Sequence, residues 1–367
     1  MDNGSKKLNV LPGLVIAAIL IGVAALAAAV VAVVRVGDSN GSVATSMSGM
    51  DMGMGSGDMA HMAPISIAGI TDAPSDQGGT RLKGVMRNGV MEFNLDARPV
   101  WWRIFGRQKL AAYAYNGIVP GPEIHVPNGQ RVRIKFTNHL PVDTTVHWHG
   151  IGVPNSMDGV PDVTQAPIKP GGTFTYEFTA RPAGQPNGGG TFLYHSHVDE
   201  DIQMAVGLAG AFIIDPPTPG PTYSVEKTLV FSEWTADAQT GRTRGVMDMA
   251  GMLPNFFTIN GKSYPDTTPI NVKVGKPVLL RLVNAGQMSH PIHLHGTSFL
   301  VVARDGHPVP AGAQERRDTV TLASGERADI AFTEPMRGKW LIHCHIGHHL
   351  TNDGAMPGGL VAVVNAT

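Results

Sequence analysis

The sequence predicts an all-β protein with two consecutive β-sandwich domains. From Arg81 onward, short runs alternate polar and apolar residues, as in 131–136 and 174–178, and turn clusters such as "VPNG" and "KPGG" separate them. Such runs are typical of the half-buried strands of a sandwich or barrel. No long segment beyond residue 40 shows helical periodicity, and the 45 glycines and 27 prolines fit a loop-rich β protein.

An apolar segment precedes the strand-rich part. There is no charged residue from Leu8 to Val34, and a helix rising about 1.5 Å per residue over this length spans a hydrocarbon core of roughly 30 Å. The run is longer than the roughly 7–15 apolar residues of a signal peptide. We therefore expect residues 1–36 to be a single-pass membrane anchor. The alternative is a cleaved signal peptide, which would give a secreted protein.

Two lysines, Lys6 and Lys7, precede the apolar run and favour a cytoplasmic N-terminus. The globular domains would then lie on the extracytoplasmic side of the cell membrane. After the anchor, residues 37–79 are predicted to be a disordered linker rich in Gly, Ser and Met, because such a composition cannot form a packed core. Its thioethers suit Cu(I), so the linker either handles copper or is a tether with incidental methionines.

The remaining chain contains an internal repeat of roughly 140 residues. "VPNGQRVRIKFTN" ends at Asn138 and "VKVGKPVLLRLVN" ends at Asn284, and in each half a histidine follows nine residues later, in "HWHG" and "HLHG". A second His-x-His follows in each half, in "YHSH" and "IHCH". The repeat predicts one domain over 80–218 and a second over 219–367.

Four His-x-His pairs are the strongest functional signal in the sequence. Residues i and i+2 of a strand share a face, so each pair presents two imidazoles side by side. Four pairs at equivalent positions of a duplicated chain indicate metal binding, although imidazole alone suits Zn, Cu, Fe or Ni. The eight residues are His147, His149, His195, His197, His293, His295, His343 and His345.

The only cysteine, Cys344, lies between two of these histidines and therefore points to the opposite face of its strand. A single cysteine excludes an intramolecular disulfide. His290 and His349 are the candidate partners on that face. Two histidines and a thiolate with a weak axial ligand form a blue-copper electron-transfer site. One strand would then carry this copper on one face and histidine-bound coppers on the other.

The motifs "HWHG", "YHSH", "HPIHLHG" and "HCHIGHH" resemble the four copper-binding motifs of the multicopper oxidases, the laccase-like family, and the resemblance covers nearly everything after residue 80. It implies two cupredoxin-like Greek-key domains and four coppers per chain. A type 1 copper would take His290, Cys344 and His349, and a type 2 copper would take His147 and His293. A type 3 pair would take the other six histidines: His149, His195, His197, His295, His343 and His345.

The first domain is predicted to lack a type 1 copper, because Thr144 and Ser196 stand where His290 and Cys344 stand in the second half. The resemblance further implies a homotrimer, since two-domain members of the family complete the trinuclear cluster between neighbouring chains.

Two further site residues follow from the resemblance. The family places its axial type 1 residue ten positions after the cysteine, where this chain has Gly354, and Met356 lies at twelve. We expect Met356 to be the axial ligand; the alternative is an empty axial position. Asp158 matches an acidic position near the cluster and would donate protons or tune the cluster; the alternative is an ordinary Asp-Gly turn.

The implied activity is one-electron oxidation of a phenol or aromatic amine coupled to four-electron reduction of O2 to water. The methionine-rich segments favour an alternative, oxidation of Cu(I) or another metal ion. Alternatives of another class are a copper nitrite reductase or a non-catalytic electron carrier, which would hold two coppers or one. Only 16% of residues are charged and the net charge is −1, so no nucleic-acid partner is expected.

Overall fold

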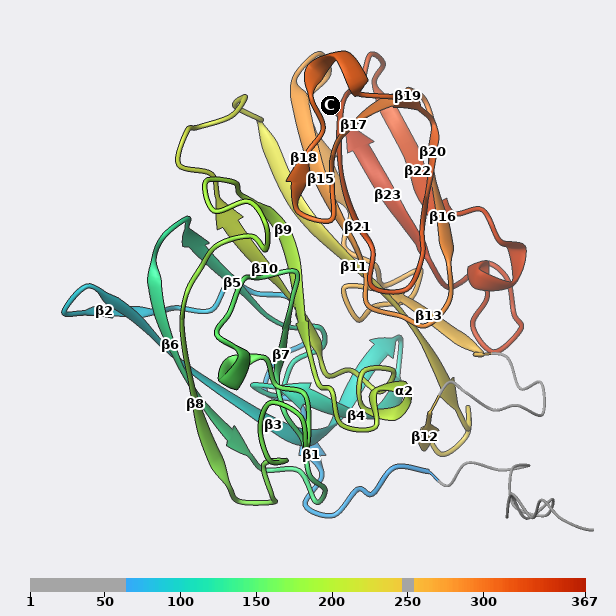
Figure 1. The fold of residues 1–367 in the computed structure, drawn as a ribbon. Coiled ribbons are helices and arrows are strands. Elements are labelled where there is room, and N and C mark those ends of the chain that lie inside the picture. Colours follow the sequence, from blue (N-terminus) through green and yellow to red (C-terminus); the bar gives the residue numbers. More distant parts are fainter. Residues whose placement is uncertain (1–63, 246–253) are drawn as a thin grey trace, which may run out of the picture. The chain divides into compact units, whose positions relative to one another are not determined.

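The computed structural model describes residues 64–245 and 254–367 (Figure 1). The predicted anchor, the linker up to residue 63 and the methionines of 246–253 lie outside the described residues. In the described part of the chain, no helix is long and apolar enough to cross a membrane.

The first domain consists of two sheets whose strands share one core. In the larger sheet the order is β1-β3-β6-β8, with β2 and β4 also paired to β3. The smaller sheet has the order β5-β10-β9-β7. The ring of Trp148 from the smaller sheet lies 5.2 Å from that of Tyr176 in the larger one, which shows that the sheets face each other. The strands are β1 (Thr71–Asp72), β2 (Val85–Arg87), β3 (Val90–Phe105), β4 (Gln108–Tyr115), β5 (Gly121–Pro127), β6 (Arg131–Asn138), β7 (His147–His149), β8 (Thr173–Thr179), β9 (Gly190–His195) and β10 (Ala209–Asp215).

The second domain repeats this arrangement. One sheet has the order β12-β11-β15-β21-β17-β18, with β13 on β11 and β19 on β17, and the other has β14-β23-β22-β16-β20. The strands are β11 (Val225–Ala236), β12 (Thr243–Arg244), β13 (Phe256–Ile259), β14 (Ile270–Val272), β15 (Pro277–Asn284), β16 (His290–Leu294), β17 (Phe299–Arg304), β18 (His307–Pro308), β19 (Arg316–Arg317), β20 (Thr319–Leu322), β21 (Arg327–Thr333), β22 (Gly338–Cys344) and β23 (Val361–Ala366). The short helices are η1 (Asn155–Met157), α2 (Glu200–Gln203), η2 (Ala311–Ala313) and η3 (Gly347–Leu350).

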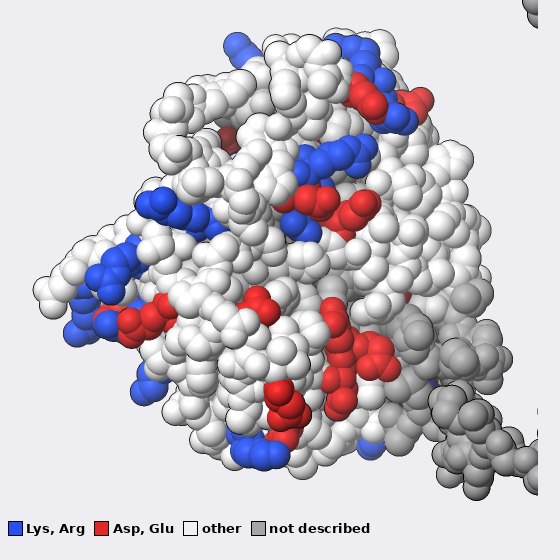
Figure 2. All heavy atoms as spheres, viewed as in Figure 1, with Lys and Arg blue, Asp and Glu red and all other residues white. Residues whose placement is uncertain are grey.

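The predicted alternation along strands is confirmed. In β6 the apolar positions Val132, Ile134 and Phe136 are buried, whereas Arg131, Arg133 and Lys135 are not. Burying an apolar side chain of this size stabilises the fold by roughly 1.5–3 kcal/mol. Polar residues on the outer face pair with each other, and Figure 2 shows lysines and arginines in small groups, several of them beside acidic residues.

The asparagines that mark the repeat fasten equivalent loops. Asn138 is fully buried, and its side-chain amide donates to the carbonyls of Val142 and Ile168 at 2.8 and 2.7 Å. Asn284 is equally buried and donates to Met288 at 2.7 Å and Leu322 at 3.2 Å. In both domains the asparagine thus fixes the loop that leads into a histidine-bearing strand.

The predicted disordered linker, 37–79, extends too far toward the first domain. Residues 64–79 are part of the first domain: β1 pairs with β3, and buried Ile65 donates its N–H to the carbonyl of Thr243 at 2.9 Å. Apolar Ile67 and Ile70 also pack on the core. These isoleucines stabilise an ordered segment, so the prediction of disorder is wrong for 64–79.

The two domains contact each other through both apolar and polar groups. The hydroxyl of Thr191 in β9 donates to the buried carboxylate of Asp329 in β21 at 2.6 Å, and Arg281 binds the same carboxylate at 2.8 Å. An apolar cluster spans the contact and contains Leu193, Met204, Ala209, Ala211, Ile213, Val230, Val283 and Ala285. The cysteine and all predicted histidine ligands therefore lie on one connected scaffold.

Candidate metal centres

Three donors converge in the core of the second domain. Cys344 ends β22, His290 begins β16 next to it, and η3 brings His349 back to the same place. All three side chains are fully buried. The Nδ1 atoms of the two histidines are 3.1 Å apart, and the Cys344 Sγ lies 3.3 Å from Nδ1 of His349 and 3.9 Å from Nδ1 of His290.

This donor set fits a metal ion. In a triangle with these sides, the point equidistant from all corners lies about 2.0 Å from each, within the roughly 2.0–2.3 Å of metal–nitrogen and metal–sulfur bonds. Two imidazoles and one thiolate are the equatorial ligands of a blue-copper site. The prediction that His290, Cys344 and His349 come together is thus reproduced by the geometry.

Burial disfavours the charged forms of His349 and Cys344. It lowers the pKa of His349 to about 3, with a further contribution from the charge of His290. Burial also raises the pKa of the Cys344 thiol to about 11. At neutral pH the imidazole of His349 can therefore accept a cation directly, whereas a metal ion must displace the thiol proton.

The structure places Met356 apart from these donors and thereby favours the alternative, an empty axial position. Its side chain is 67% exposed, whereas the three donors are fully buried. The turn formed by Asn352 and Ala355 ends just before it, and an exposed side chain there does not reach a buried site. This turn accounts for the two extra positions between Cys344 and Met356, and it does not direct the Met356 thioether toward the donors.

In the first domain, the equivalent pocket holds hydroxyl and amide groups. The hydroxyls of Thr144 and Ser196 are 3.1 Å apart, and each lies 2.8 Å from Oε1 of Gln203. All three side chains are buried. This network fills the space with hydrogen bonds and offers no thiolate or imidazole, in agreement with the predicted lack of a type 1 site.

The first set of four histidines lies together on the first domain. Nitrogens of His147, His149 and His195 lie within 4.8 Å of one another, and the ring of His197 is 5.4 Å from that of His147. Nδ1–H of His147 donates to the carbonyl of Asp158 at 2.7 Å, which leaves Nε2 free to bind a metal.

The second set, on β16 and β22, repeats this geometry. The ring of His293 lies 4.9, 5.6 and 5.5 Å from those of His295, His343 and His345. Nδ1–H of His293 donates to the carbonyl of Asp318 at 2.9 Å, as His147 does to Asp158. Equivalent histidines of the repeat are therefore held in the same tautomer.

One hydrogen bond joins the two faces of β22. Nδ1–H of His343 donates to the carbonyl of Cys344 at 2.7 Å. His195 makes the same contact with the carbonyl of Ser196 at 2.8 Å. Only in the second domain does this bond lead to a thiol.

The two histidine sets are separate within one chain. In the described residues, ring contacts occur within each set and none joins a ring of one set to a ring of the other. His147, His149 and His197 are half-buried and His345 is exposed. Within the described residues, the eight histidines therefore form two sets of four and not one site.

Burial disfavours the charged form of four imidazoles in the two histidine sets. Burial lowers the pKa of His149 to about 4, with help from the charge of Arg327. Burial lowers the pKa of His195 to about 3, and it also lowers the pKa of His295 and His343. Neutral imidazole is the form that binds metals.

Asp158 lies beside the first set. Its carbonyl accepts the bond from His147, and its carboxylate lies 3.5 Å from the same Nδ1. On the other side of the set, Glu200 lies 3.6 Å from His195 and 3.8 Å from His197. Both carboxylates are thus close enough to influence the histidines.

Sequence reasoning missed two residues of the buried site. Glu233 is fully buried and accepts Nε2–H of His290 at 3.2 Å. The ring of Phe257 stacks on that of His349 at 4.5 Å. The sequence holds one signal for Glu233: it is the only acidic residue in the apolar run "LVFSEW", and a buried carboxylate needs a partner.

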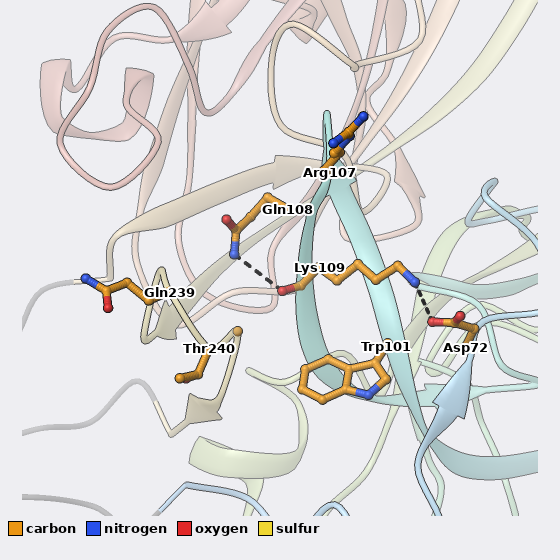
Figure 3. Close-up of a pocket in the computed structure, with 8 residues that line it drawn as sticks. Asp72, Trp101, Arg107, Gln108, Lys109, Gln239 and Thr240 are labelled. Atoms are coloured by element: carbon orange, nitrogen blue, oxygen red, sulfur yellow. Dashed lines mark hydrogen bonds and ion pairs between the residues drawn. The ribbon is translucent and has the colours of Figure 1, made fainter.

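A surface pocket of about 390 Å³ lies away from all these residues (Figure 3). Two of its three charged side chains, Asp72 and Lys109, pair with each other at 2.5 Å, and the third is Arg107. None of the predicted site residues lines it. The histidine and cysteine clusters are therefore the candidate centres.

Comparisons with known proteins agree with this geometry. Residues 97–219 and 238–358 each match a family model described as multicopper oxidase. The blue copper oxidase of Nitrosomonas europaea is 35% identical with a TM-score of 0.69, over 75% of this chain and 85% of that one. The multicopper oxidase mgLAC is 32% identical with a TM-score of 0.67, over 75% of this chain and 86% of that one.

Curated relatives are longer proteins. Laccase-2 of Oryza sativa is 36% identical over 48% of this chain and 33% of its own length. The multicopper oxidase MmcO of Mycobacterium tuberculosis is 28% identical over 61% of this chain and 48% of its own length. The chain thus matches between a third and about half of these two relatives.

With both sandwiches cupredoxin-like and both halves matching, the chain belongs to the multicopper oxidase family.

Proposed function

We propose that this protein is a laccase-like oxidase that takes single electrons from a reducing substrate and reduces O2 to water. One observation carries the proposal: Cys344 at the end of β22 joins a buried pair of histidines, and its two neighbours in sequence, His343 and His345, belong to the second histidine set. A simple electron carrier needs only the buried site, and a nitrite reductase needs no type 3 pair. Of these three functions, only an O2-reducing oxidase needs all of the donors on both faces of this strand.

Each group of donors has an assigned metal in this proposal. His290, Cys344 and His349 hold the type 1 copper, and His147 and His293 hold the type 2 copper. When bound, the four coppers supply one-electron transfer and storage of four electrons. The other six histidines hold the type 3 pair: His149, His195, His197, His295, His343 and His345.

The chain's own residues provide a short route between the sites. Cys344 contributes its sulfur to the buried site, and its carbonyl accepts the Nδ1–H of His343 at 2.7 Å. Covalent bonds and this hydrogen bond thus connect the thiol to the second histidine set. Asp158 orients His147 through its carbonyl, and we assign its nearby carboxylate to proton supply or to tuning of the cluster.

The separated histidine sets support a homotrimer. Each chain carries half of the eight ligands on each domain. If the first domain of one chain meets the second domain of the next, a head-to-tail ring completes every cluster, and a heterologous interface closes in this way when its rotation fits. Leu341, 37% exposed, lies at i−2 from His343 on β22 and would pack in that interface.

The proposed substrates are phenols or aromatic amines. A second candidate is Cu(I), favoured by the methionines at 47–62 and by 38% identity over 145 residues to copper resistance protein A of Pseudomonas syringae. We further propose that residues 1–36 anchor the protein in the cell membrane with the domains on the extracytoplasmic side.

An oxygen electrode tests the proposal. The copper-loaded protein should consume one O2 for every four electrons supplied by a phenol, and without release of peroxide. Comparing the rate of Cu(I) oxidation with that of phenol oxidation, with and without residues 43–62, distinguishes the two candidate substrates. Nitrite reduction without O2 uptake would contradict the oxidase, as would blue absorption without any O2 consumption.

A further inference from the structure

Glu233 is a buried carboxylate that belongs to no predicted motif. It lies in β11, and its side chain is fully buried. One oxygen accepts the N–H of Gln287 and that of Met288, the latter at 2.7 Å. The other oxygen accepts Nε2–H of His290 at 3.2 Å. All three partners are donors, which a carboxylate satisfies and a neutral amide does not.

The strand pairing connects Glu233 to the second histidine of the site. Glu233 pairs directly with Phe257 across β11 and β13. The Phe257 ring stacks on His349 at an interplanar angle of 21°. A single pair of opposite residues therefore contacts both histidines of the buried site, His290 by a hydrogen bond and His349 by a ring face.

The loop before His290 is fitted to this carboxylate. A Cβ atom on Gly286 would overlap the Glu233 carboxylate. The N–H of Gly286 donates to Oδ1 of Asn284 at 2.9 Å, which fixes the loop from its other side. The loop thus reserves space for a carboxylate at this point.

The first domain provides an internal comparison. The N–H of His139 donates to the carbonyl of Ala97, as that of Ala285 does to Phe231. Ala97 and Phe231 are therefore equivalent, and two residues further along the strand the first domain has Pro99 where the second has Glu233. The carboxylate is present in the domain with the cysteine and absent from the domain that has Thr144 and Ser196 instead.

We propose that Glu233 is a positioning residue that holds His290 with Nδ1 toward Cys344 and lowers the reduction potential of the type 1 copper. This inference rests on the proposed function. Hydrogen bonding of the second ring nitrogen fixes the ligand's orientation and raises its basicity. A negative charge behind the ligand also stabilises the oxidised, more positive ion. Because Glu233 is fully buried, it acts through His290 and does not contact a substrate.

The test is a redox titration of the blue absorption in the full copper-loaded protein. Glu233→Gln keeps the shape and removes the charge, and its amide cannot accept from all three donors. We expect the equilibrium constant for one-electron reduction to rise at least tenfold, which is about 59 mV. Glu334→Gln is the matched control, because Glu334 is an equally buried carboxylate of the same domain without a hydrogen bond to a copper ligand.

Equal potentials for Glu233→Gln and the wild type would overturn the inference. Glu233→Asp keeps the charge, and its potential should stay within a threefold change of the equilibrium constant. If Glu233→Gln does not fold, the aspartate variant still decides: a tenfold rise there would show that the charge is not the cause. Absence of blue absorption from the wild type would instead contradict the proposed function.

Discussion

At the scale of single residues, burial decides which groups take part in the buried site. Cys344, His290 and His349 have no exposed surface, and their donor atoms point at one another. The lone thiol has no disulfide partner and a pKa raised to about 11, so its placement between two imidazoles is costly unless a metal replaces its proton. The residues therefore favour a metal-bound native state.

Cys344→Ser should remove the blue absorption and leave the other coppers in place. The serine hydroxyl is not a soft ligand, whereas none of the eight histidines of the His-x-His motifs is changed. Copper analysis should give three coppers per assembled chain in place of four. Retention of the blue absorption in this variant would contradict the assignment of the thiol.

Met356→Leu should leave both the type 1 spectrum and the potential unchanged. The Met356 side chain is 67% exposed, whereas the three donors are buried. A redox titration of the blue absorption measures both quantities. A clear shift of the potential would show that the loop closes over the copper and that Met356 binds it after all.

Acidification should destabilise the copper-free protein through His195. Burial lowers its native pKa to about 3, below an unfolded value of about 6.5. Between these values the unfolded state binds the proton and the native state does not, so stability falls as the pH decreases. Each pH unit costs up to about 1.4 kcal/mol, or about 2 kcal/mol from pH 6.5 to 5.

Urea unfolding of the copper-free protein at the two pH values measures this effect. His195→Gln removes the titrating group and should reduce the pH dependence by about 2 kcal/mol. An identical pH dependence in the variant would contradict the predicted pKa shift of His195.

At the scale of elements, the period of two along a strand is what makes the buried and exposed faces predictable from the sequence. It separates Cys344 from His343 and His345 on opposite faces, and it predicts the buried positions of β6. The internal repeat then identifies equivalent residues in the two domains. These inferences need only local geometry and one duplicated pattern.

Other features depend on contacts between distant segments. Glu233 meets His290 only because β11 and β15 pair in parallel and the following loop turns back. Met356 lies outside the site because a turn at 352–355 uses up two positions. Residues 64–79 are ordered because the first domain offers an apolar surface to Ile65. The alternation of residues along a strand does not predict such contacts between distant segments.

Asn284→Ala should destabilise the second domain by about 2–4 kcal/mol. The side-chain amide satisfies buried carbonyls, including those of Met288 and Leu322, and each unsatisfied buried group costs about 1–3 kcal/mol. Urea unfolding of the copper-free protein measures the loss. The control is Asn271→Ala, which removes only one exposed hydrogen bond, to Asn365. Equal effects of the two substitutions would contradict the role assigned to Asn284.

At the scale of the whole molecule, the two half-sets of histidines are the main reason to expect an assembly. Each domain carries four imidazoles, all of them at least partly exposed except buried His195, and no ring contact in the described residues joins the sets. Clustered imidazoles gain little from this arrangement without a metal. In the proposed trimer, copper shared between neighbouring chains would account for two separate half-sets.

Leu341→Asp should disrupt the trimer and abolish O2 reduction while the blue absorption remains. The substitution would place a charge in the proposed interface, whereas Cys344 lies on the other face of β22. Light scattering after size separation measures the assembly. Val85→Asp is the control, because Val85 is also exposed but lies on β2, a strand that carries no predicted ligand. Loss of the trimer in both variants would contradict the assigned interface.

The copper content of the separated trimer and monomer tests the central claim most directly. Metal analysis of the wild-type trimer should give four coppers per chain. The Leu341→Asp monomer should retain one, together with its blue absorption. Four coppers in the monomer would show that one chain builds the whole cluster, and two per chain in the trimer would contradict the oxidase.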